Sequence, residues 1–195
     1  MIEFEFKYSL NREEFTQLFN RLSNKYPKNT LLQINYYYDT DGFELEKQGI
    51  NLRVRQKEAD LKMELKTPIL RERALRVKKE FSRSIKQLPL TINFNNDEWQ
   101  GLIPGNGELH LIGILLTERT KFLPEPGIEI VLDKSYYLGL VDYELEVEFQ
   151  KGLQTQALNV VKMLVGDGQK FPPSQHGKRK RFLKALKHLS QGTVR

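Results

Sequence analysis

Carboxylates and an ammonium group recur at every second residue near the N-terminus, which reads Glu-Phe-Glu-Phe-Lys from position 3 to position 7. In a β-strand this spacing places Glu3, Glu5 and Lys7 on one face and the phenylalanines on the other. Glu144 and Glu146 repeat the pattern between apolar residues further along the chain. Because the chain has no cysteine and three histidines, a metal would be bound by oxygen. Oxygen donors favour Mg²⁺, Mn²⁺ or Ca²⁺ over Zn²⁺.

Lysines and arginines occupy the alternating positions of the middle segments, between leucines and valines. They are Arg53, Arg55, Lys57, Lys62, Lys66, Arg76, Lys78, Arg119 and Lys121. A single solvated face explains any one segment, but such faces usually mix the two signs of charge. Here carboxylates dominate the first and last segments and cations the middle ones, which favours one shared ligand. Cations bind phosphate oxygens and carboxylates bind metals, so the predicted ligand is a metal-bound phosphate chain.

Alternating polarity predicts about eight strands, which must position these side chains. The strands are expected over residues 2–8, 33–40, 50–58, 61–67, 74–83, 109–122, 127–133 and 140–149. Apolar residues at helical spacing predict helices over residues 12–24, 153–165 and about 175–189, and a short helix over 95–103. Asn11 and Glu14 have the spacing of a capping box at the start of the first helix.

Eight antiparallel strands that close on themselves leave an interior wide enough for side chains or one small ligand. We therefore expect an α+β, mainly β fold, a closed eight-stranded antiparallel barrel with a charged interior and covering helices. No repeat or linker divides the sequence, so residues 1–195 are expected to form a single domain with a basic C-terminal helix. An apolar patch left on the outer face would allow a homodimer.

The composition of the chain limits its partners. The net charge is +6 and the pI about 9.4, but much of the excess lies in the segment from Lys178 to Lys187. Without that segment the chain is near neutral and offers no evident base-stacking platform, which counts against nucleic acid. No apolar run approaches the roughly 18 residues that span a bilayer, and the charged first strand leads us to expect no signal peptide. With no cysteine, a cytoplasmic protein without membrane contact is expected.

Taken in order along the chain, these residues resemble the signature of the CYTH superfamily, the triphosphate tunnel metalloenzymes. The resemblance starts with Glu3-x-Glu5-x-Lys7 and covers nearly the whole chain, residues 1–186. The later landmarks are Tyr38-Asp39-Thr40, Leu52-Arg53-Val54-Arg55, Leu65-Lys66-Thr67-Pro68, Arg119 with Lys121, Asp133, and Gly139 followed by Glu144-Leu145-Glu146. The first motif alone is a weak signal, whereas the ordered set is a strong one.

The resemblance implies an eight-stranded tunnel that binds a triphosphate-containing small molecule with Mg²⁺ or Mn²⁺. By position, the metal-side carboxylates would be Glu3, Glu5, Asp133, Glu144 and Glu146. The groups that grip the phosphates would be Lys7, Arg53, Arg55, Lys66, Arg76, Arg119 and Lys121. The C-terminal helix of such proteins closes one tunnel mouth with a basic residue, and Lys178 and Arg181 are both candidates here.

Three positions depart from the family pattern or leave it open. Lys78 and Lys79 follow each other in the fifth strand, and alternation does not decide which points inward. Glu64 stands where related proteins often carry a small polar residue, so an ion pair with a neighbouring cation is the alternative to ligand contact. Glu148 is expected beyond the site.

The leading hypothesis is metal-dependent hydrolysis of inorganic triphosphate or a small organic triphosphate. Phosphoryl transfer needs positioning and charge neutralisation more than a covalent nucleophile. Glu144 or Glu146 would act as a general base, and Lys7 would assist at the reacting phosphate. Two alternatives remain open, namely cyclisation of ATP, as in class IV adenylyl cyclases, and binding of polyphosphate or nucleotide without turnover.

Overall fold

The computed structural model describes residues 1–95, 97–104, 107–166 and 171–192, the last three of these as backbone only. The strands are β1 (Ile2–Leu10), β2 (Lys28–Asp39), β3 (Asn51–Lys57), β4 (Asp60–Glu72), β5 (Leu75–Ile85), β6 (Thr91–Ile92), β7 (Leu109–Glu125), β8 (Ile128–Tyr137) and β9 (Leu140–Phe149). The helices are α1 (Arg12–Ser23), α2 (Glu44–Lys47), α3 (Gln154–Val165) and α4 (Lys178–Gly192), with a 3₁₀ turn at Gln100–Leu102. None of the described helices is both long enough and apolar enough to cross a membrane.

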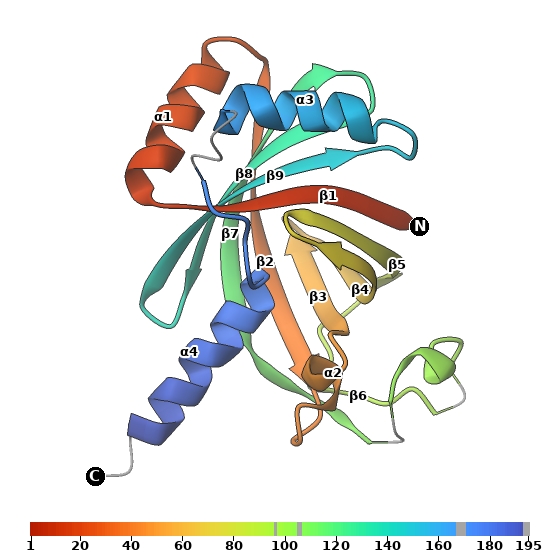
Figure 1. Cartoon of the computed structure of the whole chain (residues 1–195). Helices are drawn as coiled ribbons and strands as arrows, with labels where there is room; N and C mark the ends of the chain where they lie inside the picture. Colours follow the sequence, from red (N-terminus) through yellow and green to blue (C-terminus); the bar gives the residue numbers. More distant parts are fainter. Residues whose placement is uncertain (96, 105–106, 167–170, 193–195) are drawn as a thin grey trace.

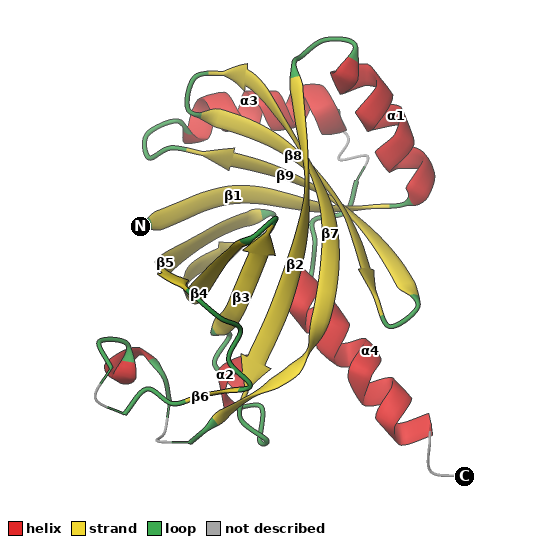
Figure 2. Ribbon diagram, turned by 180° about the vertical axis from the view of Figure 1, so that it is seen from behind, coloured by secondary structure: helices red, strands yellow, loops and turns green. Residues whose placement is uncertain are grey.

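Eight of the strands form a closed antiparallel barrel (Figure 1, Figure 2). Their order is β2-β3-β4-β5-β1-β9-β8-β7, and the pairing of β2 with β7 closes the ring. The short strand β6 adds to one end of β7, where Ile92 lies opposite Leu109. The predicted eight-stranded closed barrel is therefore confirmed, with β6 as an addition.

Apolar side chains on the outside of the barrel form the cores that the helices cover. The helices α1 and α3 lie across the outer face of β1, β8 and β9 (Figure 1), and Leu18 and Val161 join Leu132 and Leu145 in one buried cluster. A second cluster covers the outer face of β2, β3 and β4 and includes Trp99. Since successive side chains of a strand point to opposite faces, the charged positions are left to face the interior.

Several element boundaries differ from the prediction. β2 begins at Lys28, five residues earlier than expected, because its first half pairs with β7. The helix expected over 95–103 is reduced to the 3₁₀ turn, and residue 96 lies outside the described residues. The capping box of α1 is confirmed, since Glu14 N donates to Asn11 Oδ1 over 2.9 Å and Asn11 N donates to Glu14 Oε2 over 2.7 Å.

The C-terminal helix begins at Lys178 and not near residue 175. The segment before it runs alongside β1, where Ser9 N donates to Pro172 O over 3.1 Å and Ser174 N donates to Lys7 O over 3.0 Å. These hydrogen bonds and the two prolines keep the segment extended. The first turn of α4 is thereby held against the part of the barrel wall that carries Lys7.

Candidate active site

The interior of the barrel is a cavity of about 400 Å³ with a mostly charged wall. Among the described residues, thirteen lysines and arginines and seven carboxylates line it. They come from the inward positions of the strands and from the segments around α2 and α4. The charged interior predicted from alternation is therefore confirmed. An excess of cations around an enclosed space favours a polyanion as the ligand.

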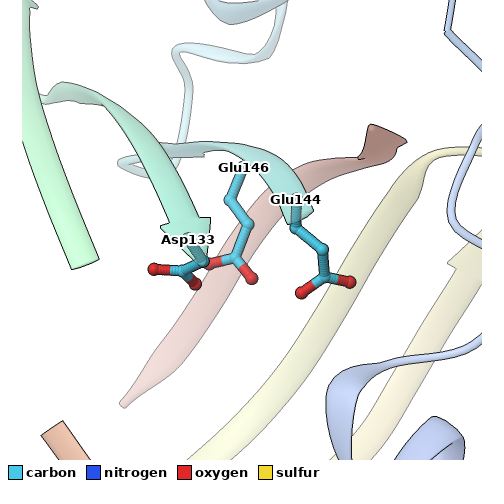
Figure 3. Close-up of side chains that lie close together, drawn as sticks. All are labelled: Asp133, Glu144 and Glu146. Atoms are coloured by element: carbon cyan, nitrogen blue, oxygen red, sulfur yellow. The ribbon is translucent and has the colours of Figure 1, made fainter. Parts of the chain in front are cut away.

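Three buried carboxylates form a cluster (Figure 3), and two of them, Asp133 and Glu146, line this cavity. Asp133 comes from β8, and Glu144 and Glu146 are alternate residues of β9, so all three share the inward face. Asp133 lies opposite Glu144 in the β8–β9 register. One oxygen of each residue lies within 4.8 Å of the others. An all-oxygen donor set of this kind fits Mg²⁺ or Mn²⁺.

The ammonium group of Lys178 lies among these three carboxylates. Its Nζ is 2.6 Å from Asp133 Oδ2, 2.5 Å from Glu144 Oε2 and 2.7 Å from Glu146 Oε1. Glu144 Oε2 is buried and makes this ion pair without a well-directed hydrogen bond from any described residue. Burial lowers the pKa of Lys178, but the three carboxylates raise it above its ordinary value. A cation is therefore strongly favoured at this position.

Arg119 and Lys7 complete the ion-pair network around Glu146. Arg119 Nη2 lies 2.6 Å from both Asp133 Oδ2 and Glu146 Oε2, and its Nη1 lies 3.1 Å from Glu148 Oε1. Lys7 Nζ lies 2.7 Å from Glu146 Oε1. Two predicted phosphate ligands are thus placed next to the predicted metal ligands, where a metal-bound phosphate would need them.

The same cations keep the clustered glutamates ionised. Burial alone would raise the pKa of Glu144 and Glu146, but Lys178 and Lys7 hold both pKa values well below their usual range. Carboxylates that remain ionised are suitable metal ligands and weak proton acceptors. The general-base role expected of these residues stays a prediction.

Glu3 and Glu5 lie in the same cavity but outside the three-carboxylate cluster. Glu3 accepts a hydrogen bond from Lys66 over 2.7 Å, and Glu5 pairs with Lys78 and with Lys7. Burial alone would raise the pKa of Glu3, but the combined effect of Lys66 and Lys78 is larger and lowers it to about 2. Their use as metal ligands would require that these lysines turn to the phosphates.

The remaining predicted phosphate ligands also line the cavity. Arg53 and Arg55 come from β3 and both contact Glu64, whereas Lys66 comes from β4. Arg76 lines the cavity too, but its guanidinium donates to backbone carbonyls, including that of Ser174 before α4. Lys121 lies 2.5 Å from Glu129 and is about one-third exposed.

The structure decides the positions that alternation left open. Lys78 points inward to Glu5, while Lys79 is exposed and lies 4.9 Å from the ring centroid of Phe81. Lys178 enters the carboxylate cluster, and Arg181 contacts Glu144 at 2.8 Å and Asp142 at 2.5 Å. The expectation that Glu148 lies beyond the site is wrong, because Glu148 lines the cavity beside Arg119.

Two long-range contacts position α4 so that Lys178 reaches the cluster. Arg179 pairs with buried Asp39 and donates to the carbonyl of Ile50. Gly113, with φ +155°, makes room for Phe182, since an added Cβ would lie 2.2 Å from the Phe182 ring. Asp39 also accepts hydrogen bonds from the backbone N–H groups of Leu45 and Glu46 in the first turn of α2. The contacts of Arg179 and of Phe182 therefore hold the start of α4 in one position.

Sequence reasoning missed several polar residues of the wall. Gln33, Asn35 and Tyr37 line the cavity from β2, and Gln33 Nε2 is buried without a hydrogen-bond partner among the described residues. Their alternation with Ile34 and Tyr36 was the available signal. Arg179 had no such signal, because nothing distinguishes it from its basic neighbours in the sequence.

Glu148 makes the stability of the protein depend on pH. Burial raises the pKa of Glu148 from 4.5 to about 7; Arg119 opposes the shift and Glu146 adds to it. The folded state therefore binds more protons than the unfolded state between these values, and stability falls as pH rises from about 4.5 to about 7. The free energy of unfolding of Glu148→Gln, relative to that of wild type, is expected to increase by about 1–3 kcal/mol when the pH is raised from 4.5 to 8. Urea unfolding in metal-free buffer measures this difference at the two pH values. An equal effect at both pH values would contradict this origin.

Comparisons with known proteins identify the family. Residues 1–164 match the model of the CYTH domain. YjbK of Bacillus subtilis, named as a triphosphatase, is 31% identical over 153 residues, which cover 75% of this chain and 77% of that protein.

Two solved structures share the fold. HpAC1 of Hippeastrum, described as an adenylyl cyclase with a dominant triphosphatase activity, is 23% identical with a TM-score of 0.73, over 93% of this chain and 95% of that one. The bh2851 protein of Bacillus halodurans, named as an adenylate cyclase, is 28% identical with a TM-score of 0.69, over 92% and 96%. Because the family model matches residues 1–164, which are most of this chain, the chain belongs to the CYTH family.

Proposed function

We propose that this protein is a divalent-metal-dependent triphosphatase that hydrolyses inorganic triphosphate or a small organic triphosphate inside the barrel. One observation carries the proposal, namely that a cavity with a large excess of lysine and arginine is lined by Asp133 and Glu146, two members of a buried cluster of three carboxylates. The first feature is complementary to a chain of phosphates, and the second to the cation that accompanies it.

Asp133, Glu144 and Glu146 would hold Mg²⁺ or Mn²⁺, with Glu3 and Glu5 as further carboxylates in the same cavity. A bound ion would offset the charge of the phosphate oxygens and polarise the phosphorus toward attack by water. The fit rests on buried oxygen donors that are ionised, and on Glu144 Oε2, which receives no directed hydrogen bond from the part of the chain that the structure describes.

The protein's own cations would position the phosphates. Arg53, Arg55 and Lys66 would bind phosphate oxygens from the β3–β4 side of the cavity. Lys7 and Arg119, which contact Glu146, would bind the phosphate nearest the carboxylates. Preorganised charges of this kind stabilise the charge that spreads over the transferred phosphoryl group.

The names of related proteins support hydrolysis as the reaction. YjbK is named as a triphosphatase, and HpAC1 is described by a dominant triphosphatase activity as well as by the cyclase name. Both chemistries start from a bound triphosphate. They are distinguished by their products.

Phosphate release from inorganic triphosphate, thiamine triphosphate and ATP tests the proposal. With Mg²⁺ or Mn²⁺ we expect turnover of at least one of these substrates, and EDTA should reduce it to background because charge neutralisation by the ion is lost. The Arg55→Met variant should have a higher KM than wild type. Lys184 is an exposed lysine of α4, so Lys184→Met should have the KM of wild type. Cyclic AMP formed from ATP would favour the cyclase alternative, and metal-aided binding without any product would favour a binding module.

A further inference from the structure

We infer that Glu64 competes with phosphate for Arg53 and Arg55 and so weakens anion binding in the cavity, an inference that rests on the proposed function. Arg53 Nε and Nη2 lie 2.9 Å and 2.7 Å from Glu64 Oε2. Arg55 Nη1 lies 3.4 Å from Glu64 Oε1. One carboxylate therefore pairs with both neighbouring guanidinium groups of β3.

The carboxylate of Glu64 is almost completely buried. Its side chain is 5% exposed, and the described residues that line the cavity include both arginines but not Glu64. Glu64 lies opposite Arg53 in the β3–β4 register, which brings the two side chains together on the inward face. The two arginines thus contact Glu64 and also line the space where a ligand would bind.

The contacts of Arg53 and Arg55 indicate what Glu64 does. Burial lowers the pKa of Arg53, but Glu64 raises it above its ordinary value and Arg119 opposes this increase. Arg53 therefore experiences a second guanidinium in the same cavity. Arg55 also donates a long hydrogen bond of 3.4 Å from its Nε to Asn35 Oδ1. Glu64 is the neighbouring anion that offsets the charge of both arginines and holds their planes.

Two consequences follow for a phosphate that enters the cavity. It meets two guanidinium groups whose orientation is already fixed, which favours binding. It also meets groups whose charge is partly offset, so each phosphate is held less tightly than two free arginines would hold it. The same effect would apply to shorter anions, including the products, and would assist their release.

The Glu64→Gln variant tests the inference, because it removes the charge and keeps the shape. Calorimetry in metal-free buffer should show inorganic triphosphate and pyrophosphate binding roughly tenfold tighter than in wild type, since one nearby negative charge is lost. In steady-state assays KM should fall, and kcat should not rise because the product is also held longer. Glu64→Asp keeps the charge and should not tighten binding. Glu72 is an exposed carboxylate of the same strand, so Glu72→Gln should bind both anions with the affinity of wild type.

The outcomes separate this inference from the proposed function. If wild type neither binds nor hydrolyses any triphosphate, the proposed function fails. The inference about Glu64 can then still be tested, by measuring how much sulfate raises the melting temperatures of Glu64→Gln and of wild type. A larger sulfate-induced rise in melting temperature in the variant would then support the role of Glu64. Unchanged or weaker anion binding by a folded Glu64→Gln protein would overturn it.

Discussion

Glu146→Gln is expected to lower kcat/KM for inorganic triphosphate roughly 10²- to 10³-fold, the range found when one preorganised electrostatic contact is removed. Glu146 is one of the three clustered carboxylates, and it also contacts Lys7, Arg119 and Lys178 at 2.6–2.7 Å. The substitution weakens the proposed metal site and releases three cations from a common partner. Phosphate release at saturating Mn²⁺ measures the loss, and calorimetry measures the accompanying fall in Mn²⁺ affinity.

Stability is the necessary control for this variant. Removing one partner of a buried ion pair destabilises a protein by about 3–5 kcal/mol, so a lower melting temperature is expected. Circular dichroism at the assay temperature must therefore show that the variant is folded. Glu125→Gln, which makes the same charge change at an exposed position of β7, should retain full activity. Activity of folded Glu146→Gln within roughly threefold of wild type would place the chemistry elsewhere.

The strands could be predicted because their alternation has a strict two-residue period. β1 and β9 each place carboxylates on one face and aromatic or aliphatic residues on the other, and both were found within two residues of their observed bounds. The first half of β2, Lys-Asn-Thr-Leu-Leu, has no such alternation. It is a strand because it pairs with β7, which is a contact between distant segments.

The grouping of the carboxylates depends on the register between neighbouring strands, and alternation along one strand does not predict that register. In the β1–β9 pairing, Lys7 lies opposite Glu146 and Glu5 lies opposite Glu148. This register gives Glu146 a cation as its neighbour and places Glu5 next to the pair formed by Glu148 and Arg119. Five carboxylates that one family signature unites are thereby divided into a cluster of three, which share Lys178, and two outside it, Glu3 and Glu5, which share Lys78.

The role of Lys178 could not be chosen from the sequence for a related reason. Lys178 to Arg181 form an unbroken basic run, and any of the four could face the cavity. The choice is made by Arg179, which pairs with Asp39, and by Phe182, which packs over Gly113. Both partners lie more than 60 residues away along the chain, where local patterns carry no information.

Lys178→Met is expected to raise the affinity for Mn²⁺ in the absence of substrate by about 10- to 100-fold. The Lys178 ammonium lies 2.5–2.7 Å from Asp133, Glu144 and Glu146, in the space that a divalent cation would need. A metal ion must therefore displace it, and breaking three ion pairs opposes metal binding. Methionine has a similar length and no charge, so the ion no longer has to displace this ammonium group from the carboxylates. Calorimetric titration of the substrate-free protein measures the effect.

The same substitution should make stability depend on metal. In EDTA the three carboxylates of the variant have lost the one cation that contacts all of them, so its melting temperature should fall below that of wild type. Saturating Mn²⁺ should raise the melting temperature of the variant more than that of wild type, because tighter binding to the folded state stabilises it further. Triphosphate hydrolysis should show a higher KM if Lys178 turns to the phosphates once metal is bound.

Lys184→Met provides the matched control, since Lys184 is an exposed lysine of the same helix, two residues beyond Phe182. Its Mn²⁺ affinity and its melting temperatures in EDTA and in Mn²⁺ should equal those of wild type. Equal or weaker Mn²⁺ binding by a folded Lys178→Met protein would show that ammonium and metal do not compete for these carboxylates. Tighter binding would show that α4 inserts a tethered cation into the site, so that metal and substrate load by displacing it.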